Sequence, residues 1–329
     1  MHQKNILVTG GFGFIGSHLV ERLLEESNNN VHVVDSLATS PIDLPAYLSR
    51  VSADGRLSYD ITTVAEYFAR RDFPKFDEIY HLASIVGPVG VLDHGGRLVQ
   101  SMVADTYAIA DCVLRMGARI CEVSTSEVYG GGRDGYCSER DAKIIPPKVS
   151  IRLEYAVGKL ACEVALTNLH RVDGLHVVIV RPFNVAGPRQ SPRGGFVLPR
   201  FIQQALTGQP ITVYGNGSMI RAFTHVQDIV DGMLKTMERG CPGEAYNIGN
   251  PANKTSIAAL AQKVVEITQS SSRIMRVDPK QLWGCLFEEA NDKFPDADRA
   301  MNELGWRPRH DLEATIRDAV RYIAEGRND

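Results

Sequence analysis

The sequence predicts an α/β protein, in which a doubly wound parallel sheet is joined to a smaller α/β lobe that would hold a substrate. Three observations support this prediction. Apolar strand patterns alternate with amphipathic helical patterns along the first 180 residues, with no repeat period. A glycine-rich turn separates the first strand from the first helix. Beyond about residue 181, Pro and Gly become more frequent and the alternation loosens, which indicates a second structural unit.

The first 35 residues contain a complete βαβ unit. The strand pattern covers residues 5–10 (NILVTG), the helix residues 16–27, and the second strand residues 31–35 (VHVVD). Both strand segments are continuously apolar, as in parallel sheets that are covered by helices on both faces. Further units follow in the same order, as strand 76–84, helix 96–117, strand 118–130, helix 152–170 and strand 176–187.

Two domains are expected from this pattern. Residues 1–180 would form a dinucleotide-binding domain and residues 181–329 a substrate lobe, with a segment from about 222 to 250 returning to the first domain. The last part of the chain has helical apolar spacing at residues 257–268 and 312–326. Because no low-complexity stretch separates the two domains, we expect them to pack tightly.

Composition argues against several classes of protein. The 329 residues carry a formal charge of −3 without a run of basic residues, so nucleic acid is not expected as a partner. Six cysteines are scattered without a CxxC pattern or a Cys/His cluster, which argues against a disulfide framework and a metal site. No secretion signal and no run of 18 apolar residues is found. We expect a soluble cytoplasmic protein that does not contact membranes.

The turn TGGFGFIG places Gly10, Gly13 and Gly16 between the first strand and the first helix. Missing side chains let the backbone approach a pyrophosphate, and the helix N-terminus supplies N–H donors and a positive dipole. Asp35 ends the next strand, 19 residues after Gly16, where a carboxylate can accept hydrogen bonds from both ribose hydroxyls. This pattern is typical of a Rossmann dinucleotide site, and the acidic residue favours NAD over NADP.

Neighbouring turns complete the predicted cofactor site. Asp60 follows another short apolar segment and is placed either to accept a hydrogen bond from the adenine amino group or on a surface loop. The segment 81–84 would end a parallel strand beside the cofactor. The other predicted cofactor contacts flank these positions and are Phe14, Ile15, Ser36, Ile61, Leu82 and Ala83.

Tyr155 and Lys159 lie four residues apart, on one face of the predicted helix 152–170. An ammonium group at this spacing favours the phenolate form of the tyrosine. With an oxidised nicotinamide nearby, the pKa of Tyr155 would fall from about 10 toward neutrality. The phenolate would then be a usable general base. A Tyr/Lys pair at this spacing often occurs on an exposed helix face without any catalytic function. Further residues are therefore needed to support this interpretation.

The preceding strand supplies residues that support a catalytic role for Tyr155 and Lys159. The segment VSTSEVYG brings Thr125, Ser126 and Glu127 to the carboxyl edge of the sheet, where ligands bind in doubly wound folds. Thr125 is placed to hydrogen-bond the hydroxyl that Tyr155 would deprotonate. Glu127 would either transfer a proton to or from the substrate or hold its own loop in place. The sequence therefore predicts a catalytic site where this strand meets helix 152–170.

The chain resembles the extended short-chain dehydrogenase/reductase family, the NAD-dependent epimerases, dehydratases and decarboxylases of nucleotide sugars. The matching segments are TGGFGFIG, STSEVYG, YAVGK, RPFNVAGPR, VYGNGSMIRAFTHVQDIVDG, YNIGN and LGWRP. Within this family, STSEVYG together with Arg152 is most similar to the UDP-glucuronate decarboxylases. Dehydratases of the family carry an Asp–Glu pair after the threonine. Ser126 stands at the Asp position, which disfavours dehydration.

The resemblance implies where a nucleotide sugar would bind. Asn184 would contact the sugar diphosphate, and the strand that ends at Tyr214 would pack near the uracil. Arg221, counted among the catalytic residues, would hold either the sugar carboxylate or only the diphosphate. Ser126 and Glu127 would face C5 and C6 of the sugar. Because members of the family commonly pair through their two long helices, a homodimer is expected.

The resemblance also implies a reaction. Tyr155 would remove the C4 hydroxyl proton while hydride leaves for NAD, and the β-keto acid would lose carbon dioxide because the ketone accepts the electrons. Reduction of the ketone would then give UDP-xylose. A nucleotide-sugar 4-epimerase is the main alternative. A 4,6-dehydratase and a non-catalytic NAD-binding module are further alternatives, and the intact Thr125, Tyr155 and Lys159 argue against the last.

Three features depart from the family's pattern, one of which is the glycine-rich segment 84–96. The long helix before the catalytic strand usually carries an asparagine where this chain has Met102, so the catalytic tetrad is incomplete. Near the C-terminus, relatives grip the nucleotide with an arginine-rich segment, whereas the corresponding NDKFPD leaves Lys293 as its only cation. These departures bear on the nucleotide and the sugar more than on the cofactor.

Overall fold

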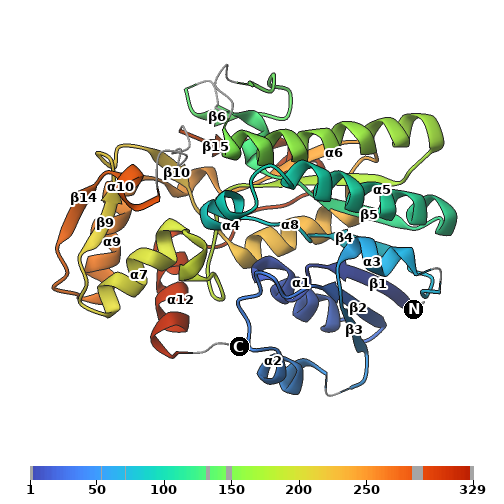
Figure 1. Cartoon of the computed structure of the whole chain (residues 1–329), viewed down its shortest axis with the longest axis horizontal. Helices are drawn as coiled ribbons and strands as arrows, with labels where there is room; N and C mark the ends of the chain where they lie inside the picture. The colour runs from blue at the N-terminus through green and yellow to red at the C-terminus, as the bar shows by residue number, and fades with distance from the viewer. Residues whose placement is uncertain are drawn as a thin grey trace.

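Seven parallel strands form the central sheet of the chain (Figure 1). The computed structural model describes residues 3–52, 54–70, 72–130, 134–145, 150–283 and 292–326. The strand order is β12-β7-β5-β4-β1-β2-β3, so the direction of winding reverses between β1 and β4. The strands are β1 (Lys4–Thr9), β2 (Asn29–Asp35), β3 (Leu57–Ile61), β4 (Glu78–His81), β5 (Arg119–Val123), β7 (Val177–Pro182) and β12 (Ala245–Ile248). The predicted doubly wound α/β fold is confirmed.

Helices cover both faces of this sheet, which explains why its central strands are largely apolar. Ile6 and Val8 of β1 pack on the face covered by α1 and α8, while Leu7 packs on the face covered by α3, α5 and α6. Figure 1 shows α5 and α6 lying side by side on one face and α1 on the other. These helices are α1 (Phe14–Leu24), α3 (Val64–Ala69), α5 (Leu98–Met116), α6 (Ile151–Asp173) and α8 (Val226–Arg239).

A second core lies beside the sheet, at the end of Figure 1 where α7, α9 and β14 are labelled. Leu198, Phe201, Leu260 and Ile316 are buried in it. Its main elements are α7 (Val197–Leu206), β9 (Ile211–Tyr214), α9 (Ile257–Thr268), β14 (Ile274–Val277) and α12 (Leu312–Ala324), with β9 and β14 paired in parallel. We call this group of elements the C-terminal lobe.

Short strand pairs connect the central sheet with the C-terminal lobe. The pairs are β6 (Tyr136–Cys137) with β15 (Phe294–Pro295), β8 (Val185–Ala186) with β11 (Thr224–His225), and β10 (Ile220–Ala222) with β13 (Lys254–Ser256). The remaining elements are α2 (Leu44–Val51), α4 (Pro88–Asp93), η1 (Ser126–Tyr129), η2 (Pro192–Gly194), η3 (Pro251–Asn253), α10 (Pro279–Trp283) and α11 (Asp298–Glu303). Segments that are far apart in sequence therefore meet beside the carboxyl edge of the sheet.

Three predicted strands are shorter than expected. The strand predicted at residues 76–84 covers only Glu78–His81, and the other two end or divide early for local reasons. The strand predicted at residues 118–130 ends at Val123, because the Thr125 side chain accepts a hydrogen bond from the Glu127 N–H and starts the 3-10 turn η1. The strand predicted at residues 176–187 is divided at Asn184, whose backbone adopts a φ of 38° that extended strands do not tolerate. Both interruptions lie at predicted site residues.

Within the described ranges, no helix combines the length and apolar character needed to cross a bilayer. Over the same ranges, no three His, Cys, Asp or Glu side chains are grouped so that they could hold a metal ion. Cys112, Cys121, Cys137, Cys162 and Cys241 are free thiols.

Candidate active site

The glycine turn after β1 is closed by backbone contacts that leave no room for side chains. A Cβ on Gly16 would lie 2.0 Å from the Gly10 carbonyl oxygen. Gly10 has a φ of 71°, and a Cβ there would lie 2.8 Å from the Ala83 backbone nitrogen. Gly13 caps α1, and none of the described side chains bonds to this helix end or adds an acidic group to its first turn. The positive end of α1 is therefore available to an anion.

Asp35 lies at the end of β2, beside this turn. Its Oδ2 accepts a hydrogen bond from the Phe12 N–H at 2.9 Å, and its Oδ1 accepts one from the Leu37 N–H at 2.7 Å. Burial raises the pKa of the Asp35 carboxyl, and the two backbone donors act in the opposite direction. The carboxylate is therefore held in one orientation at the edge of the glycine turn, as a ribose ligand would require.

Asp35→Ala is expected to weaken NAD binding by about 10- to 100-fold, because a hydrogen bond to a charged group contributes about 1.5–3 kcal/mol. NADP binding should suffer less, since a carboxylate repels a 2′-phosphate. Titration calorimetry with both dinucleotides measures the two affinities. Asp54→Ala is the matched control, because Asp54 is exposed and pairs only with Arg56 among the described residues. Unchanged NAD affinity in Asp35→Ala would contradict this prediction.

The other predicted cofactor residues lie along the same sheet edge. Backbone hydrogen bonds from Gly10 to Val34 and from Leu82 to Thr9 hold the ends of β1, β2 and β4 together. Phe14 and Ile15 begin α1, Leu82 and Ala83 follow β4, Ser36 follows β2, and Ile61 ends β3.

The carboxylate of Asp60, on β3, already contacts two protein groups. Its Oδ1 accepts a hydrogen bond from Arg70 at 2.8 Å, and its Oδ2 lies 3.1 Å from His32 Nε2. The adenine contact predicted for Asp60 therefore stays a prediction.

The predicted proton-transfer residues come together between β5 and α6. Thr125 caps η1 just after β5, and Tyr155 and Lys159 lie one helical turn apart on α6. Burial raises the pKa of Tyr155, while the charge of Lys159 and the nearby Thr125 side chain lower it by less. The protein groups alone therefore do not make Tyr155 acidic. Its predicted acidity depends on the positive charge of a nicotinamide ring.

The Lys159 side chain points into the protein. It is 3% exposed, and its Nζ donates to the Val123 carbonyl at 2.8 Å and to Glu122 Oε1 at 3.3 Å. Sequence reasoning did not single out Glu122. The sequence feature that could have identified it is a glutamate within the apolar strand RICEV, which is expected to be buried on both faces.

Glu127, on η1 beside α6, is held by two cations. Arg152 contacts both carboxylate oxygens, at 2.7 and 3.1 Å, and Lys293 Nζ contacts Oε1 at 2.5 Å. Burial would raise the pKa of Glu127, but the charges of Arg152 and Lys293 bring it well below its ordinary value. A carboxylate that stays ionised in this way is a weak proton acceptor. This favours the interpretation that Glu127 holds its loop and its cationic neighbours in place.

Arg221 adds a third cation to this cluster. It lies on β10 beside Lys293, and its Nη1 donates to the Ile220 carbonyl at 2.8 Å. Burial lowers the pKa of Lys293, as do the charges of Arg152 and Arg221. We call Glu127, Arg152, Arg221 and Lys293 the cationic cluster. Arg152 and Lys293 both contact the Glu127 carboxylate, so two positive charges meet one negative charge in these contacts, which favours the binding of a further anion.

The two other predicted substrate residues lie on different elements of the fold. Asn184, in the turn after β7, donates from Nδ2 to the Ala222 carbonyl at 3.3 Å, next to Arg221. Tyr214 ends β9 in the C-terminal lobe, and the guanidinium of Arg200 lies 3.9 Å from the centroid of its ring. Ser126 is buried at the start of η1, between Thr125 and Glu127.

Met102 packs where the resemblance led us to expect an asparagine. It is 5% exposed, and it lies in an apolar cluster with Leu98 and Cys162 that also contacts the Tyr155 ring. A Cβ on Gly158 would lie 2.9 Å from the Met102 sulfur, so the two helices approach closely at this point. Apolar packing therefore replaces a polar contact behind the tyrosine.

Comparison with known proteins agrees with this geometry. Residues 6–249 match the model of the NAD dependent epimerase/dehydratase family. The chain belongs to this family. It is 32% identical to the UDP-N-acetyl-alpha-D-glucosaminuronate decarboxylase of Bacillus cytotoxicus, over 99% of this chain and 100% of that protein. It is 33% identical to UDP-glucuronic acid decarboxylase 6 of Arabidopsis thaliana, over 92% of this chain and 84% of that protein.

Solved structures of other epimerase/dehydratase proteins share the fold. The UDP-glucuronic acid 4-epimerase of Bacillus cereus, in complex with UDP-glucuronic acid and NAD, has a TM-score of 0.83 and 26% identity over 98% of this chain and 99% of that one. The dTDP-glucose 4,6-dehydratase of Streptomyces venezuelae, with NAD bound, has a TM-score of 0.84 and 28% identity over 98% of both chains. The family predicted from the sequence is confirmed.

The residues of this chain fit the dinucleotide for which the epimerase/dehydratase family is named. The glycine cradle admits no Cβ at Gly16, the end of α1 is not occupied by a described side chain, and Asp35 is fixed beside both. Gly10, Gly13 and Gly16 would hold the pyrophosphate and Asp35 the ribose. Tyr155 and Lys159 would lie next to the nicotinamide.

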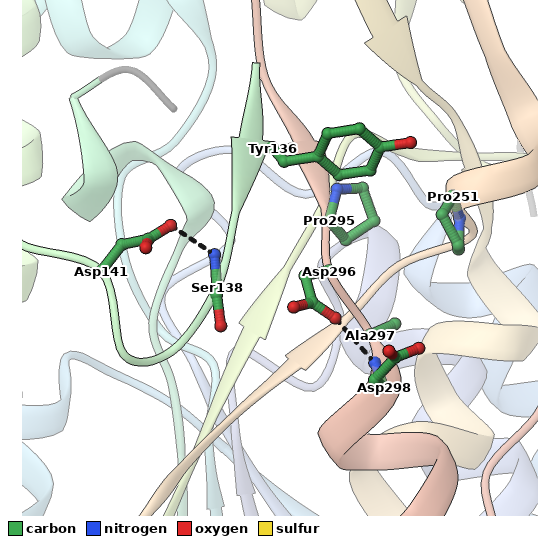
Figure 2. Close-up of a pocket in the computed structure, with 8 residues that line it drawn as sticks. All are labelled: Tyr136, Ser138, Asp141, Pro251, Pro295, Asp296, Ala297 and Asp298. Atoms are coloured by element: carbon green, nitrogen blue, oxygen red, sulfur yellow. Dashed lines mark hydrogen bonds between the residues drawn. The ribbon is translucent and has the colours of Figure 1, made fainter. Parts of the chain in front are cut away.

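A separate hollow of about 400 Å³ lies between β6, β15 and η3 (Figure 2). None of its lining residues belongs to the predicted site. Figure 2 shows that two of its carboxylates are used locally, since Asp141 accepts from the Ser138 N–H at 2.8 Å and Asp296 from the Asp298 N–H at 3.0 Å. Without converging polar groups, this hollow does not compete with the site at Tyr155.

Proposed function

We propose that this chain is an NAD-dependent UDP-glucuronate decarboxylase. The observation that carries the proposal is the contact of two cations, Arg152 and Lys293, with the carboxylate of Glu127 beside Tyr155. Two positive charges meet one carboxylate in these contacts, and a hexuronate supplies a further negative charge that a neutral sugar lacks. The two relatives described above, both named as decarboxylases of sugar acids, support this assignment.

The residues of the chain then have separate roles. Thr125 and Tyr155 bind the C4 hydroxyl, and Tyr155 takes its proton. The dinucleotide, when bound, accepts the hydride from C4. Lys293 and Arg221 orient the sugar carboxylate until the C5–C6 bond breaks and its electron pair moves toward the C4 oxygen, where Thr125 and Tyr155 stabilise the developing negative charge. A proton returns to C5, and carbon dioxide leaves.

A UDP-glucuronate 4-epimerase is the second candidate. The likeness to the solved UDP-glucuronic acid 4-epimerase favours it, and the cationic cluster would also hold a carboxylate that stays attached to the sugar. The two reactions begin with the same oxidation at C4. They differ in whether the carboxylate remains on C5 or departs.

The test is to incubate the purified protein with UDP-glucuronate and NAD, and to follow carbon dioxide, reduced nicotinamide and the product together. A decarboxylase releases carbon dioxide and forms a UDP-pentose or its 4-keto form. UDP-glucose is the matched control, because it lacks only the carboxylate. Formation of UDP-galacturonate without carbon dioxide would replace this proposal with the epimerase. No reaction with any UDP-hexuronate would reject both candidates.

We propose further that the nucleotide is UDP, that two copies of the chain form a homodimer, and that the predicted division at about residue 180 separates cofactor binding from substrate binding. Tyr107, Leu114 and Val164 are apolar residues on α5 and α6 that are 36–53% exposed, as expected for a face that a second copy would cover. Light scattering that gave the mass of a monomer at assay concentrations would contradict the dimer.

A further inference from the structure

A buried glutamate lies directly against the predicted catalytic lysine. Glu122 is on β5, three residues before Thr125, and its residue exposure is 0%. Lys159 donates from Nζ to Glu122 Oε1 at 3.3 Å. The two side chains therefore form an ion pair inside the protein, one helical turn from Tyr155. Nothing in the proposed reaction assigns a role to this carboxylate.

The second oxygen of Glu122 lacks a compensating donor. Oε2 accepts no hydrogen bond from the residues that the structure describes, and His81 Nε2 lies 3.9 Å from it. Burial lowers the pKa of His81 to about 3, so its imidazole is neutral at ordinary pH. Lys159 therefore supplies the positive charge that Glu122 faces. A buried carboxylate with an unsatisfied oxygen lowers the stability of the folded protein. Its presence next to Lys159 therefore points to a function.

Other titratable groups near the pair do not replace Glu122. Asp105 on α5 acts on Lys159 only through its charge, and burial raises the pKa of Asp105 to about 6. Glu163 on α6 is neutralised by Arg181, with contacts of 2.9 and 2.5 Å. Cys162 is a buried thiol whose pKa is raised by burial. Of these groups, Glu122 is the carboxylate that accepts a hydrogen bond from Lys159.

The protonation states of the two partners depend on each other. Burial lowers the pKa of Lys159, but the charge of Glu122 offsets this effect, and the pKa of Lys159 stands above its ordinary value. Burial raises the pKa of Glu122 to about 7, against the charge of Lys159. Above about pH 7 the pair is therefore a carboxylate with an ammonium group. In this range a buried lysine without a counter-ion would tend to lose its proton.

We propose that Glu122 is a positioning residue that keeps Lys159 protonated and anchored next to Tyr155. A neutral amine at position 159 would no longer favour the phenolate of Tyr155, so catalysis would fail as pH rises. Glu122 acts through Lys159 and does not touch the substrate. The inference rests on the proposed roles of Tyr155 and Lys159 as the proton-transfer pair.

The first test is the pH profile of Glu122→Gln, which keeps the shape and one acceptor oxygen but removes the charge. In the wild type, Lys159 stays protonated far into the alkaline range. In Glu122→Gln, the alkaline fall in kcat for UDP-glucuronate should begin at a pH lower by about one unit or more. KM should change little, because Glu122 does not touch the sugar. An alkaline limb at the wild-type position would overturn the proposal, since a role in shape alone leaves the profile unchanged.

Glu78→Gln is the matched control. Glu78 is also a buried glutamate of the central sheet, on the neighbouring strand β4, and it pairs with Lys4 and Arg119 instead of a catalytic residue. Its removal is expected to lower the thermal midpoint without moving the alkaline limb. An equal movement of the limb in both variants would show a general effect of lost charge and would also overturn the proposal.

The second test reads the charge of Lys159 directly, from the NMR signal of its ¹⁵N-labelled Nζ, assigned through its absence in Lys159→Met. We expect an ammonium signal in the wild type up to about pH 10, and loss of the proton at lower pH in Glu122→Gln. This measurement needs no turnover, so it stands even if the proposed reaction is wrong. If Glu122→Gln does not fold, the signal of the wild-type protein still tests the proposal. A Lys159 amine that is neutral below about pH 9 would contradict it.

Discussion

Tyr155→Phe is expected to reduce kcat for UDP-glucuronate by about 10²- to 10⁴-fold, the contribution of a positioned general base. The substitution removes one oxygen and keeps the ring in its apolar contact with Met102 and Leu98. The C4 hydroxyl then has no acceptor for its proton, so hydride cannot leave for the dinucleotide. The loss should appear in carbon dioxide release and in the transient absorbance of reduced nicotinamide.

The affinities of Tyr155→Phe for NAD and UDP-glucuronate serve as the internal control. Both should stay within a few-fold of the wild type, because the glycine cradle and the cationic cluster are not altered. Wild-type turnover in this variant would remove Tyr155 from the mechanism and favour the non-catalytic NAD-binding alternative. Loss of NAD binding together with activity would indicate a folding defect.

Lys293→Met is expected to lower kcat/KM for UDP-glucuronate by about 30-fold or more, since truncation of one partner of a buried ion pair costs about 2–5 kcal/mol. The Lys293 side chain is 2% exposed and contacts Glu127 Oε1, so its loss leaves the carboxylate with Arg152. The sugar carboxylate should bind more weakly, and Glu127 should be held less firmly in its position. Steady-state kinetics with UDP-glucuronate measure the loss, and calorimetry with UDP alone should show unchanged binding.

The same variant should acquire a new dependence on pH. The charges of Arg152 and Lys293 hold the pKa of Glu127 low in the wild type, so Glu127 stays ionised in any working buffer. Removal of Lys293 moves this pKa upward, and activity should then fall as pH decreases through the new value. Lys254→Met is the matched control, because Lys254 lies over the rings of Tyr136 and Phe294 and does not contact Glu127. Equal kcat/KM in Lys293→Met and the wild type would contradict the expected role.

Local sequence patterns were sufficient to predict the central sheet and the position of Asp35 beside the glycine turn. The apolar strands, the glycine turn and Asp35 lie within the first 35 residues, and their spacing alone fixes a βαβ unit. The Tyr155–Lys159 pair was predictable for the same reason, since both residues lie on one turn of α6. Strand ends were predicted less well, because the cap at Thr125 and the backbone of Asn184 depend on side-chain hydrogen bonds and individual torsion angles.

The sugar end of the site could not be predicted from local patterns. Glu127 and Lys293 are 166 residues apart in sequence, and the segment of Lys293 is held in place by the pairing of β15 with β6 and by the bridge between Lys293 and Arg221. The resemblance marked Lys293 as the only cation in a segment that grips the nucleotide in relatives. In the structure, Lys293 contacts the carboxylate of Glu127, beside Tyr155. The charge of Glu122 was visible in the strand, but its direction toward Lys159 depends on which face of β5 meets α6.

The long separation of Glu127 and Lys293 has a consequence for biosynthesis. A ribosome delivers the seventh strand of the sheet, β12 (Ala245–Ile248), before it reaches Lys293. A nascent chain stopped between these two points has all the strands of the nucleotide cradle, but Glu127 and Arg152 still await their third partner. The chain order therefore places every strand of the central sheet before the segment that completes the contacts of Glu127 with Arg152 and Lys293.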